Sequence, residues 1–189
     1  MKISKYVLFL IISCMSIVVR AQDSTRRQST VIGKASLEIG RVIKKEFISI
    51  YKSDAGGGLF IENWPIEVEI ANILDAATKL NYSGVKISTD IFFGRTAFID
   101  YNEVLGFLNF IEMLNEVVKN IPKNYTEYVY NLNDLRLIAY QKSVNKKNPN
   151  PYWAFSFIIE GKNYGVELKI LNEIKNAISK NINLMVHNK

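Results

Sequence analysis

The sequence predicts an α+β fold of two units, each with four antiparallel strands followed by one helix. Two groups of segments alternate apolar and polar residues with the period of a strand. Each group is followed by a segment whose apolar residues recur with the period of a helix. Stretches rich in turn-forming residues separate these segments. We expect two curved sheets, each covered by its own helix.

Residues 1–21 have the pattern of a secretory signal peptide. Lys2 and Lys5 form a short basic region, and an apolar stretch covers 6–19. Val19-Arg20-Ala21 places small residues at the −3 and −1 positions of a cleavage site. The stretch is too short for a membrane-spanning helix of about 20 residues. We therefore expect an exported protein (periplasmic, envelope-associated or secreted) with no transmembrane segment after cleavage.

Cys14, the single cysteine, lies inside this signal. The sequence Ile11-Ile12-Ser13-Cys14 resembles a lipobox, which would make Cys14 a lipid anchor. The apolar run continues past it through Ile17, Val18 and Val19, which favours an ordinary apolar signal region. The mature chain then has no disulfide, no thiol nucleophile and no thiolate metal site.

The composition also argues against most enzymes. His187, the single histidine, is third from the C-terminal residue, where chains fray. Most catalytic dyads and zinc sites need a positioned imidazole or thiolate. We therefore predict no catalytic residue, no cofactor and no metal.

The charge of the mature chain is modest. Of the 24 basic residues, Lys2, Lys5 and Arg20 leave with the signal, so 21 basic residues face 18 acidic ones, a net charge of +3. This is a weak electrostatic signal for nucleic acid, and solubility explains it equally well.

Residues 22–37 read as a polar lead-in, and 38–121 as the first unit. Its second strand alternates clearly, with Ile66 and Val68 on one face and Glu67 on the other. The first strand loses its alternation near Glu46-Phe47, which predicts a bulge. The expected strands are 41–51, 64–74, 80–89 and 95–99.

The first helix begins at a recognisable cap. Asp100 and Glu103 form a D-x-x-E variant of the capping box. An apolar stripe then runs from Val104 to Ile121, and Pro122 follows its end.

Residues 122–189 repeat this order as the second unit. A helix is expected from about Leu171. Asn172-Glu173-Ile174 follows Asn102-Glu103-Val104 by 70 residues, which suggests an internal duplication. The expected strands are 125–131, 135–142, 152–160 and 164–168.

The β-β-β-β-α order resembles the repeat of the PUR domain and, more loosely, the Whirly and PC4 folds. This resemblance is one of topology and implies single-strand nucleic-acid binding, which export and the small charge argue against. The phrase Thr96-Ala97-Phe98-Ile99-Asp100-Tyr101 before an amphipathic helix resembles uncharacterised exported bacterial families. Neither resemblance carries over a functional residue.

Aromatic residues gather in the second unit, and four of them are candidate binding residues. Tyr128 and Tyr130 share one face of an expected edge strand, and Tyr152 and Trp153 lie at a strand entry after Pro151. Aromatic side chains on a sheet serve recognition when exposed and core packing when covered, so burial by the other half of the chain is the alternative.

Carboxylates offer the one route to catalysis. A glycan hydrolase would need two carboxylates roughly 5–10 Å apart in one pocket. Nothing in the spacing of the carboxylates along the sequence requires any two of them to lie that close together. The candidates are Asp90, Asp100, Glu103, Asp134 and Glu160.

The sequence therefore favours an exported, non-enzymatic protein that binds another protein, either an envelope component or a second copy. The alternatives are the glycan hydrolase and the single-strand nucleic-acid binder. A partner is expected at sheet faces without a helix or at free strand edges.

Overall fold

The computed structural model describes residues 30–38, 40–53, 65–89, 95–142 and 152–185. Several features named above lie outside these residues. They are the signal peptide with Cys14, residues 22–29 of the lead-in, position 64 at the start of the second expected strand, Asp90, Pro151 and His187.

The first sheet contains four antiparallel strands in the order β1-β2-β3-β4, as the alternating segments predict. Ile66, Val68 and Ile70 are buried on one face of β2, which confirms its alternation. The strands are β1 (Ile43–Lys52), β2 (Ile66–Asp75), β3 (Asn81–Thr89) and β4 (Arg95–Asp100).

The bulge of β1 is not where the sequence predicts it. The pairing with β2 shifts between Ser49 and Tyr51 rather than near Glu46 and Phe47. β1 is an edge strand with exposed positions on both faces, so polar residues occur on either face. A break in the apolar–polar alternation of β1 therefore does not mark the position of the bulge.

The second sheet repeats the plan with order β5-β6-β7-β8, again antiparallel. Glu160 and Gly161 connect β7 to β8 with φ of 49° and 76°. Two successive positive φ values are typical of a tight hairpin turn. The strands are β5 (Glu127–Asn131), β6 (Leu135–Lys142), β7 (Tyr152–Ile159) and β8 (Lys162–Val166).

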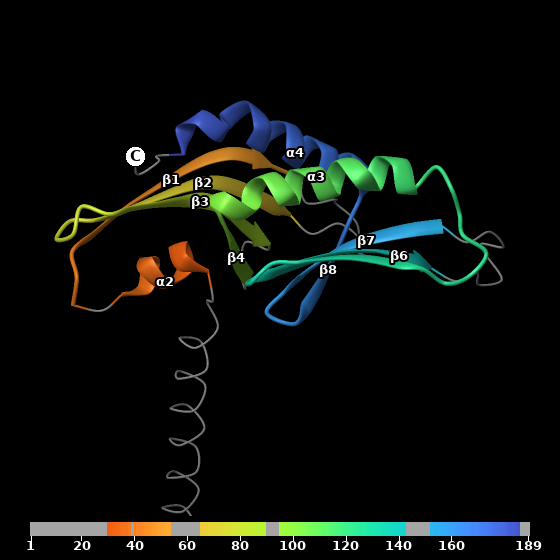
Figure 1. The fold of residues 1–189 in the computed structure, drawn as a ribbon, viewed down its shortest axis with the longest axis horizontal. Coiled ribbons are helices and arrows are strands. Elements are labelled where there is room, and N and C mark those ends of the chain that lie inside the picture. Colours follow the sequence, from red (N-terminus) through yellow and green to blue (C-terminus); the bar gives the residue numbers. More distant parts are fainter. Residues whose placement is uncertain (1–29, 39, 54–64, 90–94, 143–151, 186–189) are drawn as a thin grey trace, which may run out of the picture.

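Two helices lie side by side above the sheets (Figure 1). They are α3 (Tyr101–Val117) and α4 (Leu168–Asn181), and a short 3₁₀ turn (Ile182–Leu184) follows α4. The amides of Asn115 and Asn172 exchange hydrogen bonds of 2.9 and 2.8 Å between the two helices. These bonds join the two units across the helix layer.

The expectation that each sheet has its own helix holds only in part. α4 follows the second sheet in sequence, yet it packs on β1 and β2 of the first. α3 packs on β3 and β4 and also reaches the second sheet, where Phe110 stacks on Tyr130. One helix layer therefore spans both sheets.

α4 begins earlier than expected, at Leu168 rather than Leu171. Asn172 is consequently the fifth residue of α4, whereas Asn102 is the second residue of α3. The 70-residue repeat of Asn-Glu does not fall at equivalent helix positions, although the order of elements does repeat.

A short helix that the sequence analysis did not identify, α2 (Val31–Leu37), lies within the lead-in. It covers the face of the first sheet opposite α3 and α4 (Figure 1). Ile32 and Ala35 pack there against Ala71, Ile73 and Phe98. The first sheet thus has helices on both faces.

A single apolar core connects both units. Ile70 and Ile87 of the first sheet belong to the same buried cluster as Leu137 and Phe157 of the second and Ile174 of α4. Among the described residues, no helix has the length and apolar character needed to cross a membrane.

Candidate functional site

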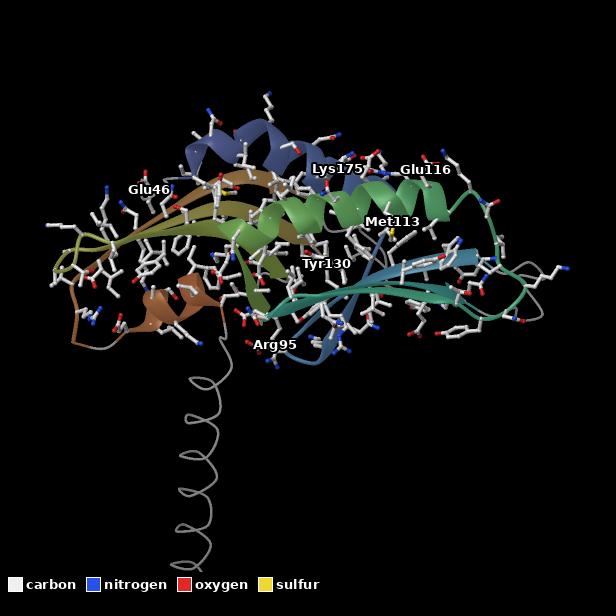
Figure 2. All side chains as sticks on the ribbon, in the orientation of Figure 1. Glu46, Arg95, Met113, Glu116, Tyr130 and Lys175 are labelled. Atoms are coloured by element: carbon white, nitrogen blue, oxygen red, sulfur yellow. The ribbon has the colours of Figure 1, made fainter. Side chains whose placement is uncertain are left out.

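Tyr130 faces inward, between β5 and α3 (Figure 2). Its ring stacks on Phe110 with centroids 5.2 Å apart and an interplanar angle of 24°. Its hydroxyl occupies the space that a side chain at Gly106 would need. Burial, with a smaller contribution from the Glu103 carboxylate, raises the pKa of Tyr130 and keeps the phenol neutral.

Tyr128 and Trp153 form a second contact under α3. Their ring centroids are 5.6 Å apart, at an angle of 48°. The Trp153 Nε1–H donates a 3.0 Å hydrogen bond to the carbonyl of Asn120, just after α3. With Tyr130, these residues are half-buried against the core and fasten the second sheet to the helix layer.

Tyr152 points the other way. It is 39% exposed and pairs with Lys142, whose Nζ lies 6.0 Å from the centre of its ring. Of the four predicted residues, the structure therefore brings three together beneath α3 and leaves one on the opposite surface.

We call that opposite surface the outer face of the second sheet. The strand registers place aliphatic, aromatic and basic residues together on it, and Figure 1 shows no described helix over it. On β5, β6 and β7 its members are Glu127, Val129, Asn131, Arg136, Ile138, Tyr140, Lys142, Tyr152, Ala154, Ser156 and Ile158.

An open hollow of about 660 Å³ lies at one end of this face, where β4 meets the second sheet. We call it the junction hollow. It is lined by residues from β4, the end of β5, the β5–β6 turn, β6, the end of β7 and the β7–β8 turn. They are Thr96, Asn131, Leu132, Asn133, Asp134, Leu135, Arg136, Ile158, Glu160 and Gly161.

Both carboxylates of the junction hollow have partners. Arg95 forms an ion pair with Glu160 and links β4 to the β7–β8 turn. Asp134 accepts a 2.8 Å hydrogen bond from the hydroxyl of Thr30, the N-cap of α2. These contacts hold the wall of the hollow in place.

Asp100 joins two helix starts. It forms the predicted capping box with Glu103 at α3. Its carboxylate also accepts 2.9 Å hydrogen bonds from the backbone N–H groups of Val31 and Ile32 in α2. One side chain therefore caps helices on opposite faces of the first sheet.

The pKa of Glu103 is raised above its ordinary value. Burial raises its pKa, and the Asp100 and Asp134 carboxylates raise it further, against a lowering hydrogen bond from the backbone of Asp100. The structure thus brings Asp100, Glu103 and Asp134 near one another. Within the described part of the chain, no group of three or more acidic, histidine or cysteine residues is arranged to hold a metal.

What these carboxylates can do chemically follows from their partners. Asp100, Asp134 and Glu160 each accept a hydrogen bond or ion pair that positions a helix, a turn or a strand. A carboxylate with such a structural partner is less available as the proton donor or nucleophile of a glycosidase.

The sequence analysis missed Arg136, Asn131 and Asn133 as candidate residues. Asn131 and Asn133 belong to an Asn-Leu-Asn-Asp turn, whose composition indicates a turn but no ligand. Arg136 is a single arginine in an alternating strand. Only the meeting of β4 with the second sheet makes a hollow beside them.

Comparison of the sequence with models of known families and with curated proteins found no match. The resemblance to PUR-type topology therefore stays a prediction.

Proposed function

We propose that this chain is an exported, non-enzymatic binding protein that recognises a protein partner through the outer face of its second sheet. One observation carries the proposal. The first sheet has helices on both faces, whereas the described helices cover only the inner face of the second.

The composition of the outer face supports a protein partner. Val129 is 40% exposed and Tyr152 is 39% exposed, and the half-buried Tyr140 lies between β5 and β7 in the same ladder. Arg136 and Lys142 add exposed basic groups. Aromatic and arginine side chains around aliphatic ones are typical of protein interfaces.

The four predicted binding residues then have different roles in this proposal. Tyr152 contacts the partner directly. Tyr128, Tyr130 and Trp153 hold the sheet against α3 and keep its outer face flat and available. The partner is an envelope component or a second copy, reached after the signal-like residues 1–21 direct export.

Photocrosslinking tests this proposal. A photoreactive phenylalanine analogue replaces Tyr152 or Tyr140 on the outer face, or Leu105, which is 63% exposed on α3, as a matched control. Each mature variant is irradiated with envelope extract from its own organism, and adducts are identified by mass spectrometry. We expect positions 152 and 140 to capture the same protein and position 105 not to capture it.

The adduct also identifies the kind of partner. An adduct of twice the chain mass indicates a second copy, and another mass indicates an envelope component. Equal capture at all three positions, or no adduct at 152 and 140, would contradict the proposal.

A further inference from the structure

Arg136 differs from the other described arginines. Arg41 pairs with Glu38 and Asp75, and Arg95 pairs with Glu160. Arg136 is exposed, and no ion pair or hydrogen bond of its guanidinium occurs within the described ranges. It borders the junction hollow with all of its donors available.

Two amides stand beside this guanidinium. Asn131 is directly opposite Arg136 in the β5–β6 ladder, and Asn133 lies in the turn between these strands. Both are exposed and line the junction hollow. An amide both donates and accepts hydrogen bonds. The two asparagine side chains can therefore form hydrogen bonds with a peptide group that lies next to an anion bound by Arg136.

The walls of the junction hollow limit the ligand further. Asp134 and Glu160 disfavour any anion in the hollow, a doubly charged one about twice as strongly as a singly charged one, while the ion pair with Arg95 offsets the charge of Glu160. Leu132 and Ile158, both half-buried, supply an apolar wall. A volume of about 660 Å³ lies within the range of small-ligand sites.

From these observations we infer that the junction hollow binds the free C-terminal carboxylate of a peptide. Arg136 forms the paired hydrogen bonds that a guanidinium makes with a carboxylate. Asn131 and Asn133 bind the last peptide group, and the apolar wall takes the last side chain. The inference rests on the proposed function, since it names the part of the protein partner that this end of the outer face recognises.

Nuclear magnetic resonance with small probes tests the inference on the mature chain. The probes are N-acetyl-leucine, N-acetyl-leucinamide and inorganic phosphate. The readouts are the side-chain Nε–H signal of Arg136 and the side-chain amide signals of Asn131 and Asn133. We expect N-acetyl-leucine to shift all three saturably and at least about tenfold more tightly than the amide, which lacks the charge.

Two variants make the test specific. Arg136→Gln should weaken N-acetyl-leucine binding by at least about tenfold, read from the asparagine signals. Lys142→Gln removes the same charge from the same face six residues along β6, or about 20 Å away, and should change the affinity less than twofold. Equal binding of acid and amide, tighter binding of phosphate, or no effect of Arg136→Gln would overturn the inference.

The two proposals fail separately. If the probes do not bind while Tyr152 and Tyr140 still capture a partner, the carboxylate site is wrong and the binding face stands. If N-acetyl-leucine binds but the outer face captures nothing, the hollow is a peptide site and the proposed protein interface is wrong.

Discussion

Gly106 lies where α3 crosses the second sheet, and its lack of a side chain leaves room for Tyr130. A Cβ at this position would meet the Tyr130 hydroxyl at closer than van der Waals distance, with the ring Cζ at 3.4 Å. The ring cannot withdraw freely because it is stacked on Phe110. A residue with poor helix propensity thus serves the contact between helix and sheet.

Gly106→Ala should lower the free energy of unfolding by about 1–3 kcal/mol, the usual effect of overpacking. In a Tyr130→Phe background the hydroxyl is gone, so alanine should stabilise α3 by roughly 0.5–1 kcal/mol. Denaturant unfolding of the four proteins gives the coupling energy. Gly84→Ala is the contrast, because its Cβ would meet the backbone carbonyl of Ile99, which Tyr130→Phe does not change. Equal effects of Gly106→Ala in both backgrounds would contradict this account.

Asp100 offers a second test at the same scale, because it caps α2 and α3 together. Asp100→Ala should cost about 1–2 kcal/mol of stability for the lost caps. Hydrogen exchange should rise at the amides of Val31 and Ile32. Asp100→Asn keeps one acceptor oxygen and should fall between the alanine variant and the parent. Unchanged exchange in Asp100→Ala would show that α2 is held by its apolar contacts alone.

Among the elements, the turn between β2 and β3 is organised by Asp75, which is 3% exposed. Its carboxylate accepts hydrogen bonds from the N–H groups of Ala77 (2.8 Å) and Thr78 (3.2 Å) and from Arg41 (2.8 Å). Burial opposes the charge, but these bonds lower the pKa of Asp75 from 3.8 to about 2.

A depressed carboxyl pKa in the folded state stabilises the fold above the unfolded pKa and loses this effect as the pH falls through the folded value. The contribution of Asp75 should therefore be complete above about pH 4 and lost towards pH 2. Asp75→Asn keeps an acceptor for the turn but not the charge. The stability difference between parent and variant, from urea unfolding, should shrink across this window. Glu116→Gln, at an exposed surface pair with Lys119, is the control. A constant difference between pH 4 and pH 2 would refute the assignment.

The sequence predicts elements well where burial alternates with one period. α3 and the first half of β2 are such elements, because one face of each is in the core. α2 is only seven residues long, so its apolar pattern is too short to recognise. Its position depends on Asp100 and Asp134, which are distant in sequence.

For the molecule as a whole, the path of α4 could not be predicted from local patterns. An amphipathic helix shows which of its faces is buried but not which sheet buries it. The same holds for the candidate site. The aromatic residues of the second sheet were found in the sequence, but α3 decides that Tyr130 faces inward while Tyr152 stays exposed. The junction hollow exists only because β4 lies against the second sheet.

Because the core is shared, the two halves should not fold independently. Residues 22–121 and 122–189, produced separately, should each lack a cooperative unfolding transition in circular dichroism, and mixing them should restore one. The control is the intact chain with a protease site inserted between positions 121 and 122. When this chain is cleaved after it has folded, it should keep its cooperative unfolding transition. A cooperative transition of either half alone would contradict the prediction.

The placement of α4 on β1 and β2 also has a consequence for how the chain is made. Domains tend to fold from the N-terminus as they leave the ribosome. Here β1 and β2 lack the helix that covers their inner face until α4, far downstream in the chain, has emerged. A precursor that cannot close its core during synthesis stays extended for longer. In the proposed export, if the chain is threaded through the membrane, the late helix would delay folding until translocation is nearly complete.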